Sequence, residues 1–156
     1  MIIRRALAQD ANELAQFNSS IARETEGIEL IPDVITAGVK AMIENPQMGF
    51  YLVAEDEGTI AAALMTTTEW SDWRNGLFWW IQSVYVMPEY RRQGLYRQLY
   101  QEAKNMAENE PGVCGYRLYV ERDNTIAQQT YLALGMEETD YKLYEELKAG
   151  TDFSED

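Results

Sequence analysis

The sequence contains no histidine and only one cysteine, Cys114, among its 156 residues. Nucleophilic machinery that depends on a Ser-His or Cys-His pair is therefore excluded. A single thiol also rules out an internal disulfide and a zinc site built from several thiolates. Cys114 lies in the run Val-Cys-Gly-Tyr-Arg, where we expect a small, buried core residue.

Long apolar runs are also missing, since none approaches the roughly 20 residues that a membrane-spanning helix needs. The start of the chain has no long apolar segment of the signal-peptide kind and reaches a charge at Asp10. Hydrophobic residues make up 46% and charged residues 25% of the chain, as in soluble globular proteins. We therefore expect a soluble, cytoplasmic protein that binds no membrane. Its length favours a single domain, residues 1–150, followed by an acidic tail, residues 151–156, that frays.

Basic residues are scarce, with 13 Lys and Arg against 26 Asp and Glu and a net charge of −13. Such a surface repels nucleic acid and attracts cationic small molecules, although it also serves solubility alone. Three of the 13 basic residues fall within seven positions: Arg91, Arg92 and Arg97. Arginines concentrated in one segment of an acidic protein indicate an anion-binding site.

Hydrophobic periodicity and turn residues predict an alternation of strands and helices. The strands are expected at residues 2–6, 50–55, 59–68, 77–86 and 116–120, with one or two more in 137–147. The helices are expected from Asp10 to Gly27, at 33–45, from Gly94 to Pro111 and at 124–134. The polar segment 69–76 is predicted to be a loop. This order predicts an α/β fold with a mixed central sheet and helices on its faces.

A basic loop joins the strand that ends at Val86 to the helix that begins near Gly94. The first N–H groups of a helix are unpaired and carry partial positive charge, so a pyrophosphate binds well there. Glycine permits close approach of the backbone, and arginines add charge-assisted contacts. The spacing matches neither a Walker loop nor a Rossmann fingerprint.

This segment resembles a motif of the GNAT N-acetyltransferase superfamily, Arg/Gln-x-x-Gly-x-Gly/Ala. Arg91 and Gly94 match its first two positions, whereas Tyr96 stands where the family has a small residue. The resemblance implies that backbone amides of the loop hold the pyrophosphate of acetyl-CoA and that the preceding strand pairs with the pantetheine arm. The cofactor-binding residues so implied are Val84, Tyr85, Val86, Arg91, Arg92, Gln93, Gly94, Leu95, Tyr96 and Arg97.

Residues 124–136 are similar to the second motif of the same family, Asn-x-x-Ala-x-x-x-Tyr-x-x-x-Gly-Phe/Met. Every position of it matches, namely Asn124, Ala127, Tyr131, Gly135 and Met136. The Asn124 amide can cap the helix or bond to the pantetheine arm, so that Asn124, Ala127 and Tyr131 join the implied cofactor site. In the family the equivalent tyrosine protonates the departing CoA thiolate. A phenol of pKa about 10 and a thiol near 8.5 make this transfer feasible, although packing alone also accounts for a tyrosine here.

The attacking amine has to lose a proton, because an amine of pKa about 10.4 is almost fully protonated at pH 7. Without histidine, a carboxylate, a tyrosine or a water chain must accept that proton. Glu69 is the candidate catalytic base, with Asp72 and a water relay as alternatives, while Trp80 stands where some family members carry a base. Aromatic residues that can surround an amine or cation are Trp70, Trp73 and Trp79.

The two motifs together predict a GNAT acyl-CoA N-acyltransferase fold. They imply an enzyme that transfers acetyl directly from acetyl-CoA to a primary amine of a small, cationic metabolite in a ternary complex, without a metal. A protein or peptide amine is the alternative acceptor, and a non-catalytic acyl-CoA sensor is the alternative function. No nucleic-acid partner is expected. The family also implies a homodimer, with the C-terminal strand as a candidate interface.

Overall fold

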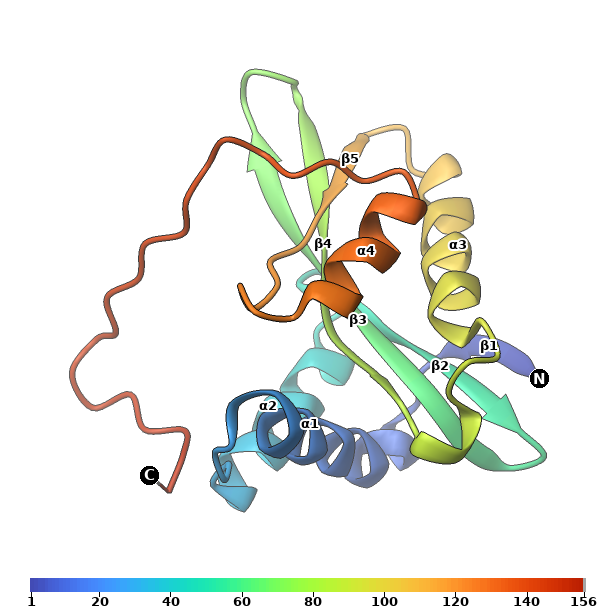
Figure 1. Ribbon diagram of the computed structural model, residues 1–156, viewed down its shortest axis with the longest axis vertical. Helices are drawn as coiled ribbons and strands as arrows, with labels where there is room; N and C mark the ends of the chain where they lie inside the picture. The colour runs from blue at the N-terminus through green and yellow to red at the C-terminus, as the bar shows by residue number, and fades with distance from the viewer. Residues whose placement is uncertain (156) are drawn as a thin grey trace.

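The computed structural model describes residues 1–155, and its centre is a sheet with the strand order β1-β2-β3-β4-β5 (Figure 1). The strands are β1 (Ile2–Arg5), β2 (Gly49–Asp56), β3 (Thr59–Ser71), β4 (Gly76–Val86) and β5 (Val113–Arg117). Neighbouring strands are antiparallel except β4 and β5, which run parallel. The predicted mixed sheet is confirmed.

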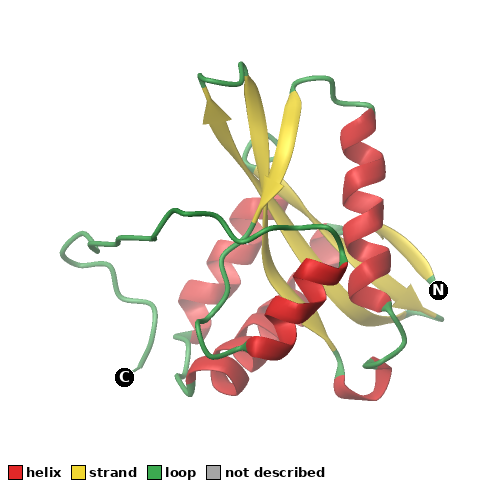
Figure 2. Ribbon diagram, turned by 45° about the horizontal axis from the view of Figure 1, so that its top comes forward, coloured by secondary structure: helices red, strands yellow, loops and turns green. Residues whose placement is uncertain are grey.

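Helices cover both faces of this sheet (Figure 2). The α-helices are α1 (Ala11–Glu26), α2 (Pro32–Glu44), α3 (Leu95–Glu108) and α4 (Thr125–Ala133), and the short 3₁₀ helices are η1 (Ala8–Asp10) and η2 (Pro88–Tyr90). Tyr51 and Val53 of β2 pack with α1 and α2, whereas Leu52 and Ala54 pack with α3. Successive side chains of a strand point to opposite faces, so an apolar strand of this kind is covered on both. Within residues 1–155, none of these helices has both the length and the apolar character needed to cross a bilayer.

Turn residues and a proline account for several boundaries of the strands and helices. The β2–β3 hairpin turns at Glu57 and Gly58, whose φ angles of 47° and 87° are the positive values that a tight two-residue turn requires. Pro32 begins α2, as expected of a residue whose fixed φ suits the first helical turn. The predicted hairpin and the predicted helix 33–45 are both confirmed.

The predicted loop 69–76 is too long, because β3 continues to Ser71 and β4 begins at Gly76, which leaves residues 72–75 as the turn between them. Glu69 pairs with Phe78 across the two strands. A two-stranded arm that extends beyond the core keeps its backbone hydrogen bonds while exposing polar side chains. The polarity of this segment therefore reflects solvent exposure and not irregular structure.

The predicted strands after α3 are partly wrong. The strand expected at 116–120 is displaced, since β5 is Val113–Arg117. The described residues 137–147 form no strand, and after α4 the chain runs away from the sheet in a long arc (Figure 1). Alternating apolar residues such as Tyr141 and Leu143 stay exposed there. Alternation fits the period of a strand, but a strand also needs an edge to pair with.

The acidic tail, residues 151–156, is expected from its composition to fray. Two backbone hydrogen bonds of 2.9 and 2.8 Å join residues 153–155 to residues 29–31, just before α2. Asp156 lies outside the described residues. The end of the arc is thus attached to the body of the protein next to α2.

Candidate active site

Strands β4 and β5 separate partway along their length. β5 pairs with β4 only from Leu77 to Trp80, whereas β4 stays paired with β3 up to Val86. No strand of the described chain therefore lies beside the second edge of residues 81–86. Backbone N–H and C=O groups on such an edge require partners. The opening between β4 and β5 can therefore hold an extended ligand by strand-like hydrogen bonds.

A β-bulge interrupts β4 within this opening. Around Ser83, β4 has one residue more than the stretch of β3 that it pairs with, and the φ of Ser83 is 50°. Bulges of this kind redirect side chains and leave a residue unpaired. The Tyr85 ring lies in the core, 5.0 Å from the Phe17 ring, while Val84 and Val86 pack toward α3. The Met87 N–H bonds to the Ala61 carbonyl, so alternation along this strand pair directs the Tyr85 backbone at β3, and neither the backbone nor the ring of Tyr85 faces the opening.

Beyond the opening the chain passes through η2 into the loop before α3. Arg92 and Gly94 have φ angles of 65° and 77°, and Gly94 occupies the position before the first residue of α3. Gln93 folds back onto a carbonyl of η2 at 3.4 Å, and Leu95 is buried in the core. A Cβ at Gly94 would meet no atom within 4 Å. The positive end of α3 is consequently open to an anion.

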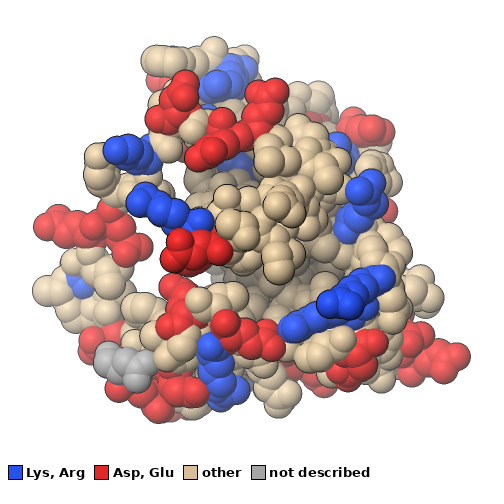
Figure 3. All heavy atoms as spheres, viewed as in Figure 1, with Lys and Arg blue, Asp and Glu red and all other residues tan. Residues whose placement is uncertain are grey.

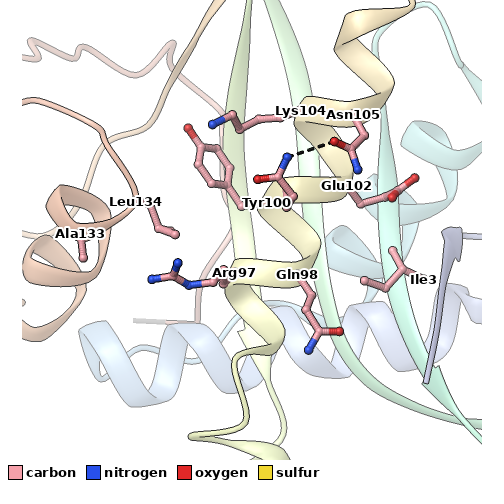
Figure 4. A pocket seen from close by; sticks show the side chains of 10 residues that line it. Ile3, Arg97, Gln98, Tyr100, Glu102, Lys104, Asn105, Ala133 and Leu134 are labelled. Atoms are coloured by element: carbon pink, nitrogen blue, oxygen red, sulfur yellow. Dashed lines mark hydrogen bonds between the residues drawn. The ribbon is translucent and has the colours of Figure 1, made fainter.

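The arginines of this loop have different surroundings. The Nε of Arg91 donates to a β4 carbonyl at 2.9 Å, and its Nη2 lies 3.2 Å from a Glu24 carboxylate oxygen. Arg92 and Arg97 are exposed and make no ion pair within residues 1–155. Arg97 lines a cavity along α3, where it and Lys104 extend toward the end of α4 (Figure 4). Arg92 and Arg97 are thus better placed than Arg91 to contact a phosphate.

The second motif forms α4 and its caps. The Oδ1 of Asn124 accepts a hydrogen bond from the Ala127 N–H at 3.2 Å, which confirms the predicted cap. At the other end Gly135 has a φ of 97°, and the Met136 N–H donates to the Tyr131 carbonyl at 3.1 Å. Capping uses the oxygen of the Asn124 amide and leaves its NH₂ group unpaired within the described chain. That group is able to donate to a ligand.

Tyr131 extends from α4 toward α3 and contacts Tyr96. Their ring centroids are 5.7 Å apart with the planes tilted by 50°, and Tyr96 also stacks on Tyr100 at 6.2 Å. Tyr96 therefore fills the space between the two helices at the motif position where the family has a small residue. Burial raises the pKa of both Tyr131 and Tyr96, so both are neutral phenols at pH 7.

A cavity of about 330 Å³ lies on the exposed side of β3 and β4. Glu69 is fixed in it, because its Oε1 accepts hydrogen bonds from Trp80 Nε1 at 3.0 Å and from Arg117 Nη1 at 2.8 Å. The Arg117 guanidinium in turn lies 3.7 Å from the centroid of the Phe78 ring. The cavity is lined by Thr67, Thr68, Glu69, Trp80, Gln82, Tyr119 and Leu143. The sequence indicated Glu69, but it gave no signal for Arg117 or Tyr119.

The predicted aromatic wall is wrong for its three tryptophans, Trp70, Trp73 and Trp79. Trp79 is buried in the core, and the other two are exposed near the tip of the hairpin. The Asp72 carboxylate accepts a hydrogen bond from its neighbour in that turn at 2.8 Å. Aromatic surface near Glu69 comes instead from Trp80 and Tyr119, whose rings are 6.1 Å apart. Alternation along β4 explains the difference, because adjacent residues face opposite sides of the sheet.

Cys114 is exposed, which corrects the expectation of a buried core residue. It lies on β5, the edge strand of the sheet, where coverage by other elements is incomplete. Within residues 1–155, no three or more cysteine, aspartate or glutamate side chains gather as they would around a metal ion.

The chain matches the model of the acetyltransferase (GNAT) family over residues 11–136. A possible acetyltransferase from Clostridium difficile 630 has 46% sequence identity and a TM-score of 0.88, over 94% of this chain and 97% of that one. No curated protein matches the chain.

Two more distant structures share the fold. A predicted acetyltransferase from Clostridium acetobutylicum with acetyl-CoA has 20% identity and a TM-score of 0.77, over 93% of this chain and 95% of that one. The aminoglycoside N-acetyltransferase AAC(6')-Iy in complex with CoA has 16% identity and a TM-score of 0.78, over 95% of each chain. The fold, the two motifs and the family match agree, and the chain belongs to the GNAT family of acetyltransferases.

Proposed function

We propose that this acetyltransferase moves the acetyl group of acetyl-CoA directly to a primary amine of a small, cationic metabolite, in a ternary complex on a single domain, residues 1–150. The observation that carries the proposal is the β4 opening, which lies between an uncapped helix start and a half-buried tyrosine, Tyr131. One end of the opening suits phosphate, and the other suits proton transfer to a leaving group.

The proposed acetyl-CoA site is formed by the open edge of β4 and the start of α3. The backbone of Val84 and the N–H of Val86 would pair with the pantetheine arm, whereas the Val86 carbonyl already accepts a hydrogen bond from Arg91 Nε at 2.9 Å. The Asn124 NH₂ group would add a donor. The N–H groups at the start of α3 would hold the pyrophosphate, with Arg92 and Arg97 as cationic contacts. Two structures that share the fold contain CoA or acetyl-CoA, which supports this choice of donor.

The acceptor site is the cavity around Glu69. Its volume of about 330 Å³ suits a small molecule better than a folded protein surface. The Glu69 carboxylate attracts an ammonium group, and the faces of Trp80 and Tyr119 add cation–π contacts. Acidic side chains are scattered around the visible face (Figure 3), and the net charge of −13 favours the approach of cations. One of the structures sharing the fold acetylates aminoglycosides.

The residues then have distinct chemical tasks. Glu69, directly or through a water molecule, takes a proton from the ammonium so that the neutral amine can attack the thioester carbonyl. Tyr131 donates its phenolic proton to the departing thiolate, which leaves as a thiol. The elevated pKa of Tyr131 keeps this proton in place until the sulfur acquires negative charge.

Comparison of wild type with Tyr131→Phe tests this function. Thiol release from acetyl-CoA is measured against a panel of diamines, polyamines, aminoglycosides and peptide amines. Tyr131→Phe is expected to lower turnover by about 10²–10⁴-fold, the usual contribution of a general acid, and to leave acetyl-CoA affinity unchanged in calorimetry. Tyr144→Phe is the control, since Tyr144 is fully exposed at 88%.

Equal turnover in wild type and Tyr131→Phe would remove Tyr131 from the mechanism. Binding of acetyl-CoA without thiol release to any amine would instead identify a sensor. Preference for peptide amines over small cations would assign the alternative acceptor class.

A further inference from the structure

The hydroxyl of Tyr96 is buried and has no hydrogen-bond partner within residues 1–155. A buried hydroxyl without a partner destabilises a fold. The Tyr96 ring is held by its contacts with Tyr100 and Tyr131, and phenylalanine would make the same contacts. The hydroxyl is therefore not needed for packing. It is available to donate a hydrogen bond to a group that becomes negatively charged during the reaction.

The place of Tyr96 in the fold identifies that group. It is the second residue of α3, at the positive end of the helix dipole. Across the space between the helices its ring meets that of Tyr131 at 5.7 Å. The rings are in contact, but no hydrogen bond joins their hydroxyls in this structure, so the side chains would have to shift for one to form. A negative charge that forms on the Tyr131 phenol would then have an unpaired donor, the Tyr96 hydroxyl, on the neighbouring side chain.

We propose that Tyr96 is a positioning residue for acetyl transfer, whose hydroxyl donates a hydrogen bond to the phenolic oxygen of Tyr131 while Tyr131 acts as the acid. The inference rests on the proposed function. In this step the O–H bond of Tyr131 breaks, and an S–H bond forms on the leaving thiolate. The electron pair stays on the Tyr131 oxygen, so the negative charge moves from sulfur to that oxygen. Tyr96 keeps its own proton throughout.

The relative acidities explain why a second donor is needed. A phenol is a weaker acid than a thiol by about 1.5 pKa units, and burial raises the pKa of Tyr131 further. Proton transfer to the thiolate is therefore uphill unless the phenolate is stabilised. A hydrogen bond to the charged form favours that form. A small residue at position 96, as in the family motif, would leave the Tyr131 oxygen without this donor.

The test compares Tyr96→Phe, Tyr131→Phe and the double variant with wild type. Without ligand, Tyr96→Phe is expected to melt at a higher temperature than wild type, because it loses an unsatisfied buried hydroxyl. Its affinity for CoA, measured by calorimetry, should stay within about 2-fold, while kcat falls by about 10-fold or more. Tyr116→Phe is the matched control, since Tyr116 packs edge-on against Tyr100 on the other side of the stack, and its kcat should not change.

The double variant decides whether Tyr96 acts through Tyr131. In the Tyr131→Phe background no phenolate forms, so the loss of the Tyr96 hydroxyl should change kcat by less than about 2-fold. Unchanged kcat in Tyr96→Phe, a lower melting temperature, or an equal loss of kcat in both backgrounds overturns the inference. If only Tyr131→Phe lowers turnover, the proposed function stands and the role of Tyr96 is lost. If neither variant lowers turnover, Tyr131 is removed from the mechanism and the role of Tyr96 is lost with it.

Discussion

The carboxylate of Glu69 and the guanidinium of Arg117 lie 2.8 Å apart, although 48 residues separate them in the chain. The contact forms because the long β3–β4 hairpin places Glu69 beside the end of β5. Trp80 donates to the same Oε1 atom at 3.0 Å, whereas Oε2 accepts no hydrogen bond in the described chain. Glu69 is therefore held in place by one oxygen and is able to receive an acceptor amine with the other.

Replacing this carboxylate tests its role. Glu69→Gln keeps an acceptor oxygen for Arg117 and Trp80 but removes the charge, so kcat/KM for a cationic amine should fall by about 10²-fold, in the range of general base catalysis. Affinity for acetyl-CoA should not change. Asp72→Asn, in the exposed hairpin turn, is the control and should behave as wild type. Normal kinetics in Glu69→Gln would mean that Glu69 neither binds nor deprotonates the acceptor.

The loop before α3 offers a paired glycine experiment. Gly94 and Gly27 have similar φ angles of 77° and 65°, and a Cβ at either position meets nothing within 4 Å. Replacement of either by alanine should lower the free energy of unfolding by about 1–2 kcal/mol, the cost of the left-handed conformation. Only Gly94→Ala should also weaken CoA binding in calorimetry, since Gly27 ends α1 and is not part of the loop before α3. Equal CoA affinity in the two variants would show that the phosphates do not bind at this loop.

The raised pKa of Tyr131 predicts the alkaline behaviour of the enzyme. A general acid acts only while protonated, and burial extends the protonated range of Tyr131 upward from the usual pKa of about 10. Turnover should therefore show no decline from this residue below about pH 10. Stopped-flow turnover of wild type, with folding monitored by circular dichroism, checks this. A fall centred near pH 8 that disappears in Tyr131→Phe would contradict it.

Asp10 predicts how stability responds to acid. Its carboxylate lies 2.8 Å from Arg4 and accepts the Leu7 N–H at 2.7 Å. Burial opposes the charged form, but these bonds outweigh it and lower the pKa of Asp10. A lowered folded pKa means that the stabilisation is complete above the unfolded value of about 3.9 and is lost as the pH falls through the folded value.

Urea unfolding of Asp10→Asn measures this contribution. At pH 7 the substitution should lower the free energy of unfolding by about 2 kcal/mol, as for hydrogen bonds to a charged group. The difference from wild type should shrink as the pH is lowered below about 4. A difference that stays constant over this range would show that the charge of Asp10 contributes nothing to stability.

The parts of the site that the sequence predicted are those set by local geometry. Gly94 precedes α3 because the chain needs a positive φ there, and Asn124 caps α4 through an N–H three residues away. Both requirements are met within a few residues, so motif spacing reveals them. The cofactor roles assigned to this loop stay predictions.

The parts that the sequence did not reveal depend on partners distant in the chain. Arg117 joins Glu69 only through the register of β3, β4 and β5, and no local pattern encodes that register. The positions of Trp79 and Trp80, in contrast, follow from the local sequence. Side chains alternate between the two faces of a strand, so the buried Ile81 places Trp79 in the core and Trp80 outside. In segment 137–147 apolar and polar residues do alternate, but a strand forms only where a neighbouring strand is present to pair with it.

The separation of β4 from β5 gives one strand two kinds of backbone amide. Over residues 81–86, amides directed at β3 are held in a ladder, while those on the other edge face no strand. In deuterated solvent, adjacent amides should therefore exchange at alternating slow and fast rates, and the β-bulge at Ser83 should interrupt this alternation. From Leu77 to Trp80, where both edges are paired, exchange should be uniformly slow. A molecule bound along the open edge would protect its amides and remove the alternation. Exchange over residues 81–86 therefore measures ligand binding at this edge independently of acetyl transfer.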